Sequence, residues 1–170
     1  MMSTVILYMS RHGSAEKSAR LLQDKVDGQV ALVNLKSDEI PDLAQFDTVI
    51  VGGSIHAGEI QKKVKTFCSH YQNKLLEKRL GLYLCCMKKG EEAQRQFIDA
   101  YPDSLIQHAE VKGIFGGEFM FEKMNFLERM IVKKVAHVTK SISQINRKVI
   151  DHFAENLSTS SDDESTVPGI

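Results

Sequence analysis

The chain has 170 residues, of which 42% are hydrophobic and 26% charged, the composition of one globular domain rather than of a disordered or membrane-spanning chain. Lys and Arg together number 22, as do Asp and Glu, so no overall positive field would attract nucleic acid, and we expect no such partner. Three cysteines, two of them adjacent, form neither a disulfide framework nor a spaced set of metal ligands. This pattern, with no long apolar leader at the N-terminus, favours a cytoplasmic location and no metal site.

Apolar runs typical of buried strands alternate with segments of helical periodicity along most of the chain. The first run, residues 4–9, is followed by apolar residues at helical spacing through Val26, and Gly28 then ends that helix. Because parallel neighbours need helical crossovers, the alternation predicts an α/β fold with helices on both faces of a five-stranded parallel sheet. The further predicted elements are strands at 30–35, 47–52, 80–87 and 108–119, and helices at 60–71 and 91–100.

The C-terminal third departs from this alternation. Residues 119–140 form a predicted helical insertion, amphipathic and net basic, which suits either packing on the core or contact with a partner or membrane surface. Its apolar run is interrupted too often by charges to span a membrane. A last helix through residue 157 is expected to cover the sheet. Residues 158–170, acidic and rich in Ser and Thr, are predicted to be a disordered tail.

Ligands of an open parallel sheet bind beyond the carboxyl ends of the strands, where the winding direction reverses. The loop after the first strand has the sequence SRHGSA (residues 10–15) and leads directly into a helix, so its N–H groups and hydroxyls can converge on an anion. It holds neither the dinucleotide motif G-x-G-x-x-G nor the triphosphate motif G-x-x-x-x-G-K-[ST], which leaves a single terminal phosphate. Ordinary helix capping is the alternative explanation.

The loop after the third strand has the sequence GSIHAG (residues 53–58) and lies at the same reversal point. It is short, made of small residues and flanked by glycines, so its backbone can pack closely against a flat ring. A plain strand-to-helix connection is the alternative. Two such loops in the correct strand order favour one shared site.

Two stretches carry a resemblance to a known family: LYMSRHGSAEKSA (residues 7–19) and DTVIVGGSIHAGE (residues 47–59). The chain resembles the flavodoxin family over residues 4–157, and within it the flavodoxin-type, menaquinone-dependent protoporphyrinogen oxidases. The resemblance implies a flavodoxin-like three-layer sandwich with strand order 2-1-3-4-5, and FMN as the cofactor of a domain spanning residues 1–157.

The resemblance also implies the residues that hold FMN. Those at the phosphate are Ser10, Arg11, His12, Gly13, Ser14 and Ala15; those beside the ring are Ser54, Ile55, His56, Ala57 and Gly58; and those on its other side are Cys86, Met87 and Lys88. Ala15 stands where the family motif normally has a hydroxyl residue. The ring-flanking loops lack Trp and Tyr, so His56 or Met87 would take the stacking contact. His56 is the only candidate for a catalytic group.

The redox role is open between two classes. Lys88 and Lys89 near the ring would favour an anionic reduced flavin and hence ready acceptance of electrons, unless both point into solvent. This pattern, the insertion and the resemblance favour an oxidoreductase with a quinone acceptor, a porphyrinogen substrate and a role in heme biosynthesis, in peripheral contact with a membrane. The alternative is a non-catalytic electron carrier that docks to redox partner proteins.

Two further interpretations are disfavoured by the residues themselves. A dithiol relay through Cys85 and Cys86 conflicts with the alternation of side chains along a strand, which sends neighbours to opposite faces. A receiver module without flavin would need acidic residues at the ends of the first and third strands, where this chain has Ser10 and Gly53.

Overall fold

The computed structural model describes residues 2–9, 13–116, 118–119, 142–143 and 145–165. Its centre is a parallel sheet with the strands in the order β2-β1-β3-β5-β6. A short strand, β4 (Glu59–Ile60), pairs antiparallel with β3 at one end. When β4 is left out and the five parallel strands are numbered along the chain, this order is the predicted 2-1-3-4-5. The parallel strands are β1 (Ser3–Tyr8), β2 (Gln29–Asn34), β3 (Thr48–His56), β5 (Arg79–Cys85) and β6 (Val111–Gly116).

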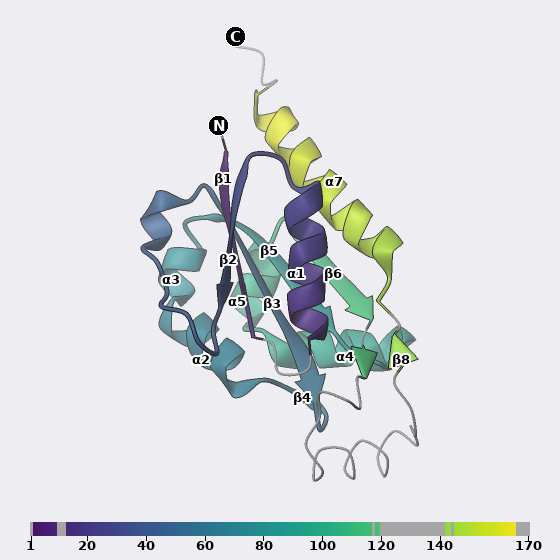
Figure 1. The fold of residues 1–170 in the computed structure, drawn as a ribbon. Helices are drawn as coiled ribbons and strands as arrows, with labels where there is room; N and C mark the ends of the chain where they lie inside the picture. The colour runs from purple at the N-terminus through teal and green to yellow at the C-terminus, as the bar shows by residue number, and fades with distance from the viewer. Residues whose placement is uncertain (1, 10–12, 117, 120–141, 144, 166–170) are drawn as a thin grey trace.

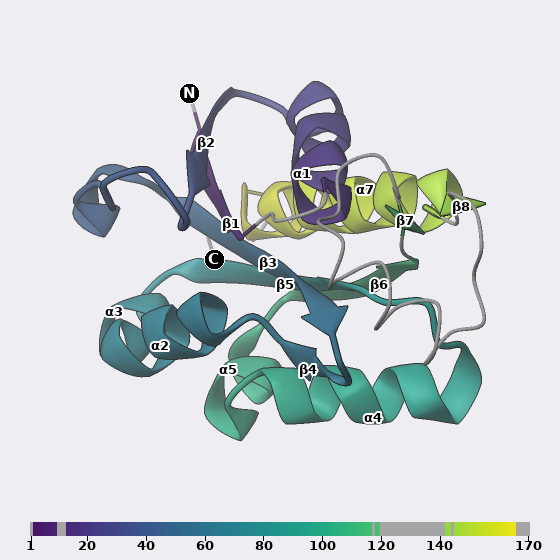
Figure 2. The same ribbon diagram turned by 60° about the horizontal axis from the view of Figure 1, so that its bottom comes forward.

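Helices cover both faces of this sheet, as Figures 1 and 2 show. One face carries α1 (Ser14–Lys25) and α7 (Arg147–Ser165). The other carries α2 (Lys62–His70), α3 (Gln72–Leu75), α4 (Gly90–Ala100) and α5 (Asp103–His108), and a short 3-10 turn, Leu43–Gln45, precedes β3. The predicted three-layer α/β sandwich is thereby confirmed.

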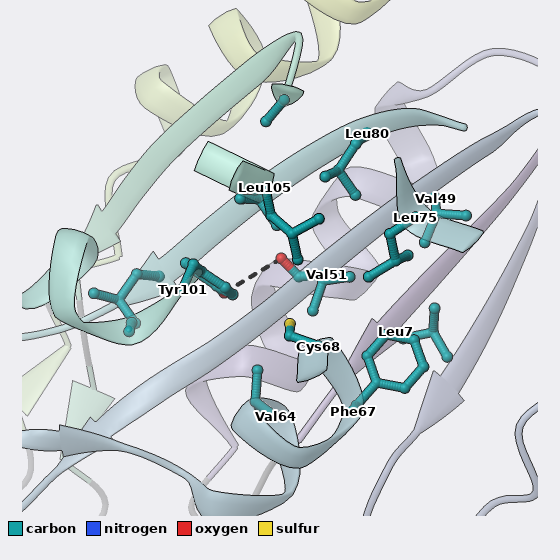
Figure 3. Packing of buried hydrophobic residues seen from close by; sticks show 14 of the residues in the cluster. Leu7, Val49, Val51, Val64, Phe67, Cys68, Leu75, Leu80, Tyr101 and Leu105 are labelled. Carbon is teal, nitrogen blue, oxygen red and sulfur yellow. Dashed lines mark hydrogen bonds between the residues drawn. The ribbon is translucent and has the colours of Figure 1, made fainter. Parts of the chain in front are cut away.

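Two hydrophobic clusters, one on each face, form the core. Side chains alternate along β1, so Val5 and Leu7 join the cluster under α2 to α5 while Ile6 and Tyr8 join the one under α1 and α7. Figure 3 shows the first cluster, with Leu7 and Phe67 among its members. Strands buried on both faces explain why the parallel strands appear in the sequence as continuous apolar runs.

β3 is longer than the sequence predicted: it continues through Gly52 and Gly53 to His56 instead of ending at the glycines. The glycines mark close packing rather than a strand end. A Cβ on Gly52 would lie 1.9 Å from Cζ of Tyr83, and one on Gly53 would lie 2.8 Å from Cδ1 of Ile60. Glycine inside a strand commonly signals such an approach.

Several other boundaries also differ. Ile60, predicted to begin a helix, lies in β4, although it is buried as expected. The predicted strand 108–119 is preceded by an unpredicted helix, α5, which takes His108, so β6 starts only at Val111. Pro102 begins that helix at the N-cap, a position where its missing N–H costs little.

The predicted insertion, residues 119–140, lies outside the described residues except for Phe119. Its two ends are held together by an antiparallel pair of short strands, β7 (Glu118–Phe119) and β8 (Ile142–Ser143). α7 continues to Ser165 and thus ends later than the boundary predicted at 158. No Gly or Pro interrupts the chain there before Pro168, so nothing in the sequence forces the helix to stop. In the described part of the chain, no helix has the length and apolarity needed to cross a membrane.

Candidate cofactor site at the carboxyl ends of the strands

The first turn of α1 faces the carboxyl end of the sheet. Gly13 is the N-cap, in the left-handed conformation (φ 95°, ψ −14°), and no side chain of the described residues makes a capping hydrogen bond there. The N–H groups of a first helical turn have no partner within the helix, and the helix dipole adds positive potential. This end of α1 therefore suits an anion such as a phosphate.

Of the residues predicted to hold a phosphate, Ser10, Arg11 and His12 lie outside the described residues, and their roles stay predictions. Ser14 is buried and lies in the first turn of α1. The Ala15 side chain is fully buried in the core, and its carbonyl accepts a hydrogen bond of 2.9 Å from the Tyr83 hydroxyl. Ala15 therefore has only its backbone N–H to offer a ligand.

The two predicted loops meet through a direct contact between hydroxyls. Oγ of Ser14, after β1, lies 2.9 Å from Oγ of Ser54, near the end of β3, and both residues are buried. Beneath them, Ser18 Oγ lies 3.3 Å from Sγ of Cys85, at the end of β5. The sequence prediction that the loops after the first and third strands form one site is consistent with this contact.

Gln61 joins the same two regions and was missed by the sequence analysis. Its Oε1 accepts a hydrogen bond of 2.7 Å from the Ser54 N–H, and its Nε2 donates one of 2.9 Å to the carbonyl of Met9. A half-buried amide thus fixes the end of β1 against the end of β3. In the sequence, Gln61 is the first of three polar residues between the apolar Ile60 and Val64, and nothing local distinguishes it from Lys62 and Lys63.

The segment predicted as a ring-flanking loop, residues 54–58, is a hairpin. Ser54, Ile55 and His56 belong to β3, and only Ala57 and Gly58 form the turn. Both turn residues have positive φ, 50° and 84°, the conformation of a type I′ two-residue hairpin. Ala57 adopts it despite its Cβ, which costs energy in this region. His56 is half-buried at the strand end, so it stays at the predicted edge of the sheet.

The loop after β5 differs from the expectation that Lys88 and Lys89 place positive charge near the ring. Cys86 is buried and Met87 half-buried. Lys88 is 60% exposed, and its Nζ lies 3.6 Å from Oε2 of Glu92, one turn along in α4. Lys89 is also exposed. The geometry therefore favours the alternative in which both lysines face solvent, and the paired carboxylate offsets the charge of Lys88.

The cysteines are buried thiols without a disulfide. Cys85 lies in the cluster under α1 and α7, whereas Cys86 lies in the cluster on the opposite face, as strand alternation requires. Burial raises the pKa of Cys85 to about 12 and that of Cys68 to about 12. Burial also raises the pKa of Cys86. Neutral thiols on opposite faces do not form a dithiol relay, in agreement with the prediction.

Comparison with known proteins gives one family match. A family model for the flavodoxin domain matches residues 5–146. Among curated protein sequences, none matches this chain. The range matched by the family model covers most of the chain, including most of β1, all of β3 and the contacts between their carboxyl ends.

Solved structures share the fold at low sequence identity. A short-chain flavodoxin associated with a non-canonical PDU bacterial microcompartment aligns with a TM-score of 0.61 and 15% identity, over 95% of this chain and 99% of its own. A flavodoxin from Streptococcus pneumoniae TIGR4 aligns at 0.54 and 16%, over 93% and 99%. Rubredoxin oxygen:oxidoreductase from Desulfovibrio gigas aligns at 0.57 and 16%, over 97% of this chain but 37% of that protein.

These matches confirm the predicted flavodoxin-like fold, and the family match supports the predicted cofactor, FMN. They bear on the family as a whole and not on the oxidase subgroup that the sequence resembles.

Proposed function

The chain belongs to the flavodoxin family, and we propose that it is an FMN-dependent oxidoreductase of the quinone-dependent protoporphyrinogen oxidase type. When bound, FMN supplies the electron or hydride transfer, and the protein supplies binding, orientation and electrostatics. The observation that supports the FMN-binding part of the proposal is the meeting of Ser14, Ser54 and Gln61 near the N-terminus of α1, where the described residues provide no side-chain cap.

The residues at this edge fit a flavin phosphate. The backbone N–H groups of the first turn of α1 and the Ser14 hydroxyl would hold the phosphate, because Gly13 brings no side chain into that space. A Cβ added at Gly58 would meet no atom of the described residues within 4 Å, so the hairpin turn is open on that side. Residues 54–58 would lie beside the ring, and Cys86, Met87 and Lys88 on its other side.

His56 is the proposed contact to the ring or the substrate. It ends β3 at the turn of the hairpin and is half-buried, which keeps its imidazole at the edge where the ring would lie. A neutral imidazole offers one donor and one acceptor, so it can hydrogen-bond either partner.

The proposed acceptor is a quinone and the proposed donor a porphyrinogen, with residues 119–140 making the peripheral membrane contact that a lipid-soluble quinone requires. Support comes from the composition of that segment and from its position between β7 and β8, where a short flavodoxin needs only a tight turn. A cytoplasmic location belongs to the same proposal.

A second candidate is a non-catalytic electron carrier docking to redox partner proteins. The observation that favours it is the exposure of Lys88 and its pairing with Glu92, which weakens the charge argument for a strongly electron-accepting flavin. Under this alternative, the exposed edge around the site would be the docking surface for the partner.

The test is a visible absorption spectrum of the full-length protein before and after addition of FMN, followed by anaerobic turnover assays. Stoichiometric FMN binding and oxidation of protoporphyrinogen only when a menaquinone analogue is present would support the oxidase. Rapid reduction by a flavodoxin reductase without porphyrinogen turnover would instead support the carrier. Failure to bind FMN would overturn both candidates.

A further inference from the structure

A groove separate from the cofactor site lies along α2. Its volume is about 490 Å³, within the range of small-molecule sites, and it lies between α2 and the segment after β2. Apolar side chains line it: Leu35, Ile40, Phe67 and Tyr71. Ile40 is 36% exposed and, with Ile98, is one of two exposed large hydrophobic residues in the described ranges. An apolar surface is thus open to a ligand here.

The same groove has cationic side chains, Lys62, Lys63 and His70. Nζ of Lys63 donates a hydrogen bond of 3.2 Å to the carbonyl of Lys36, so this ammonium bridges α2 and the turn after β2. Among residues whose placement is described, no carboxylate lies within 4.0 Å of the ammonium group of Lys62 or Lys63. Both lysines lie in the first turn of α2, where the helix dipole disfavours positive charge. A bound anion would give the two lysines a partner of opposite charge and would also interact favourably with the helix dipole.

A second cavity shares these two lysines. It has a volume of about 420 Å³, adds Lys65 to the cationic wall, and is also lined by Met9 and His56. Of the described residues that line it, Glu59 is the one that is acidic. The lysines therefore lie between the apolar groove and the ends of β1 and β3, so a ligand held by them would lie next to the cofactor edge.

We propose that this groove binds an amphiphilic small-molecule anion, with its apolar body on Leu35, Ile40 and Phe67 and its carboxylate or sulfonate on Lys62 and Lys63. A neutral apolar ligand would make no use of the exposed lysine charges, and a small polar anion would leave the apolar wall uncovered. The volume of the groove, about 490 Å³, fits a small molecule. The proposal does not depend on FMN binding, because the lining residues are those of α2 and the turn after β2.

The test uses two probes that share one ring system. 8-Anilinonaphthalene-1-sulfonate carries the anion, and N-phenyl-1-naphthylamine lacks it. Amide chemical shifts of the ¹⁵N-labelled full-length protein would be followed during titration, with and without FMN supplied. We expect shifts in residues 35–40 and 62–71, and binding of the sulfonate about tenfold tighter than that of the neutral probe. Shifts confined to other segments, or equal affinities, would overturn the proposal.

Matched variants separate charge from apolar contact. Lys62→Gln/Lys63→Gln should weaken sulfonate binding about tenfold and leave the neutral probe unchanged, whereas Lys25→Gln/Lys148→Gln, with the same loss of charge elsewhere, should change neither. Ile40→Ser should weaken both probes, and the control Ile98→Ser neither. If instead the lysine variant abolishes sedimentation with phosphatidylglycerol vesicles while sulfonate binding persists, the surface is a membrane contact and the small-molecule site is wrong.

Discussion

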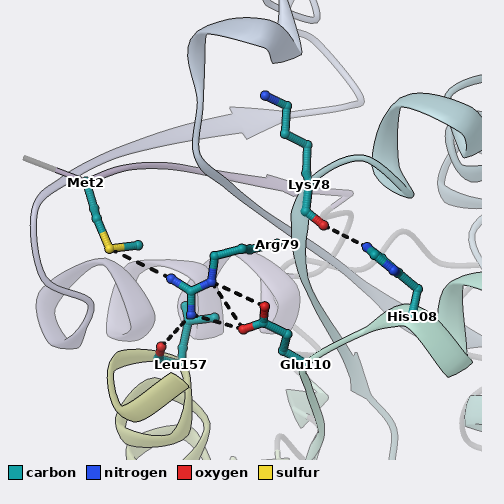
Figure 4. A network of polar contacts seen from close by, with 6 residues as sticks. All are labelled: Met2, Lys78, Arg79, His108, Glu110 and Leu157. Atoms are coloured by element: carbon teal, nitrogen blue, oxygen red, sulfur yellow. Dashed lines mark hydrogen bonds and ion pairs between the residues drawn. The ribbon is translucent and has the colours of Figure 1, made fainter. Parts of the chain in front are cut away.

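The two ends of the parallel sheet differ in how their polar groups are used. At the amino end, Arg79 makes an ion pair of 3.0 Å with Glu110 and donates a hydrogen bond of 2.8 Å to the carbonyl of Leu157 in α7, as Figure 4 shows. Beside it, Nε2 of His108 lies 2.7 Å from the carbonyl of Lys78. The polar side chains at this end thus bind one another or backbone carbonyls; they come from β5, α5 and the segment before β6.

At the carboxyl end, the described loops and helix start consist mainly of small residues. Gly13 leaves the first turn of α1 without a side-chain cap from the described residues, and Ala57 and Gly58 form a tight turn. The polar contacts between Ser14 and Ser54 and through Gln61 connect two strand ends to each other. The difference teaches that the polar side chains at the amino end stabilise the fold, while those described at the carboxyl end hold together the two strand ends at which we propose that the cofactor binds.

The largest expected effect comes from Gly52→Ala, which tests whether the small residues near the carboxyl end are also structural. The new Cβ would lie 1.9 Å from Cζ of Tyr83, a fully buried ring stacked on Phe115. Because neither ring can move freely, we expect a loss of about 3 kcal/mol or more in the free energy of unfolding, measured by urea denaturation.

The matched control for Gly52→Ala is Gly58→Asn. Gly58 has φ 84°, a Cβ added there would meet no atom of the described residues within 4 Å, and Asn tolerates this conformation. We expect a change of about 1 kcal/mol or less. A loss of about 1 kcal/mol or less in Gly52→Ala as well would mean that Tyr83 moves aside and that contact with its ring does not require glycine in β3.

Next in size is Arg79→Met, at the amino end. The variant removes the ion pair with Glu110 and the hydrogen bond to the Leu157 carbonyl, and because the Arg79 side chain is only 14% exposed, water replaces it poorly. We expect a loss of about 2 kcal/mol in the free energy of unfolding, with FMN affinity unchanged in the folded protein. Lys88→Met, which breaks the exposed pair with Glu92, should cost less than about 0.5 kcal/mol. A weaker FMN affinity in Arg79→Met would contradict the division between the two ends.

The third prediction concerns pH and the buried thiols. Burial raises the pKa of Cys85 to about 12 from an ordinary value of 9.0, so the folded protein holds this proton more tightly than the unfolded chain. Its stabilising contribution is therefore complete below pH 9 and is lost as the pH rises from 9 towards 12, at about 1.4 kcal/mol per pH unit. Cys85→Ala should reduce the slope of unfolding free energy against pH between pH 10 and 11 by about that amount.

Cys68 lies in α2 and not at the strand ends of the candidate site, so it supplies the comparison for Cys85. Burial raises its pKa to about 12 as well, so Cys68→Ala should reduce the slope equally. A clearly smaller change for Cys85→Ala would mean that water reaches the carboxyl end of β5, and the edge would then be more open than its burial indicates.

The sequence was sufficient for the fold because the signals that specify it are local and repeated. Continuous apolar runs identify strands buried on both faces, and the apolar spacing of α1 and α2 identifies the buried faces of those helices. The two glycine- and serine-containing stretches stand out in the sequence because helix N-termini and strand ends favour those residue types, and their role in holding a ligand stays a prediction.

What the sequence could not give depends on contacts between distant residues. The glycines of β3 were interpreted as a strand end because nothing local shows that Tyr83, 31 positions after Gly52, fills the space above one of them. The orientation of Lys88 depends on Glu92 in the next helix, and the role of Gln61 depends on Met9, which lies 52 positions away in the chain. Side-chain partners of this kind leave no periodic pattern in the sequence.

Gln61 therefore provides the most selective test of the carboxyl end, with a smaller effect on stability than Gly52→Ala or Arg79→Met. Gln61→Met keeps the volume but removes both hydrogen bonds, so the ends of β1 and β3 lose their bridge while the core stays filled. We expect a loss of about 1 kcal/mol in unfolding free energy but an increase of about tenfold in the FMN dissociation constant, because two binding segments lose their fixed spacing. Gln23→Met, which removes a single hydrogen bond of 3.0 Å to the carbonyl of Val30, should lower stability by a similar amount and leave FMN affinity unchanged. If both variants bind FMN like the original chain, Gln61 only stabilises the fold, and the proposed cofactor site does not depend on its bridge between the strand ends.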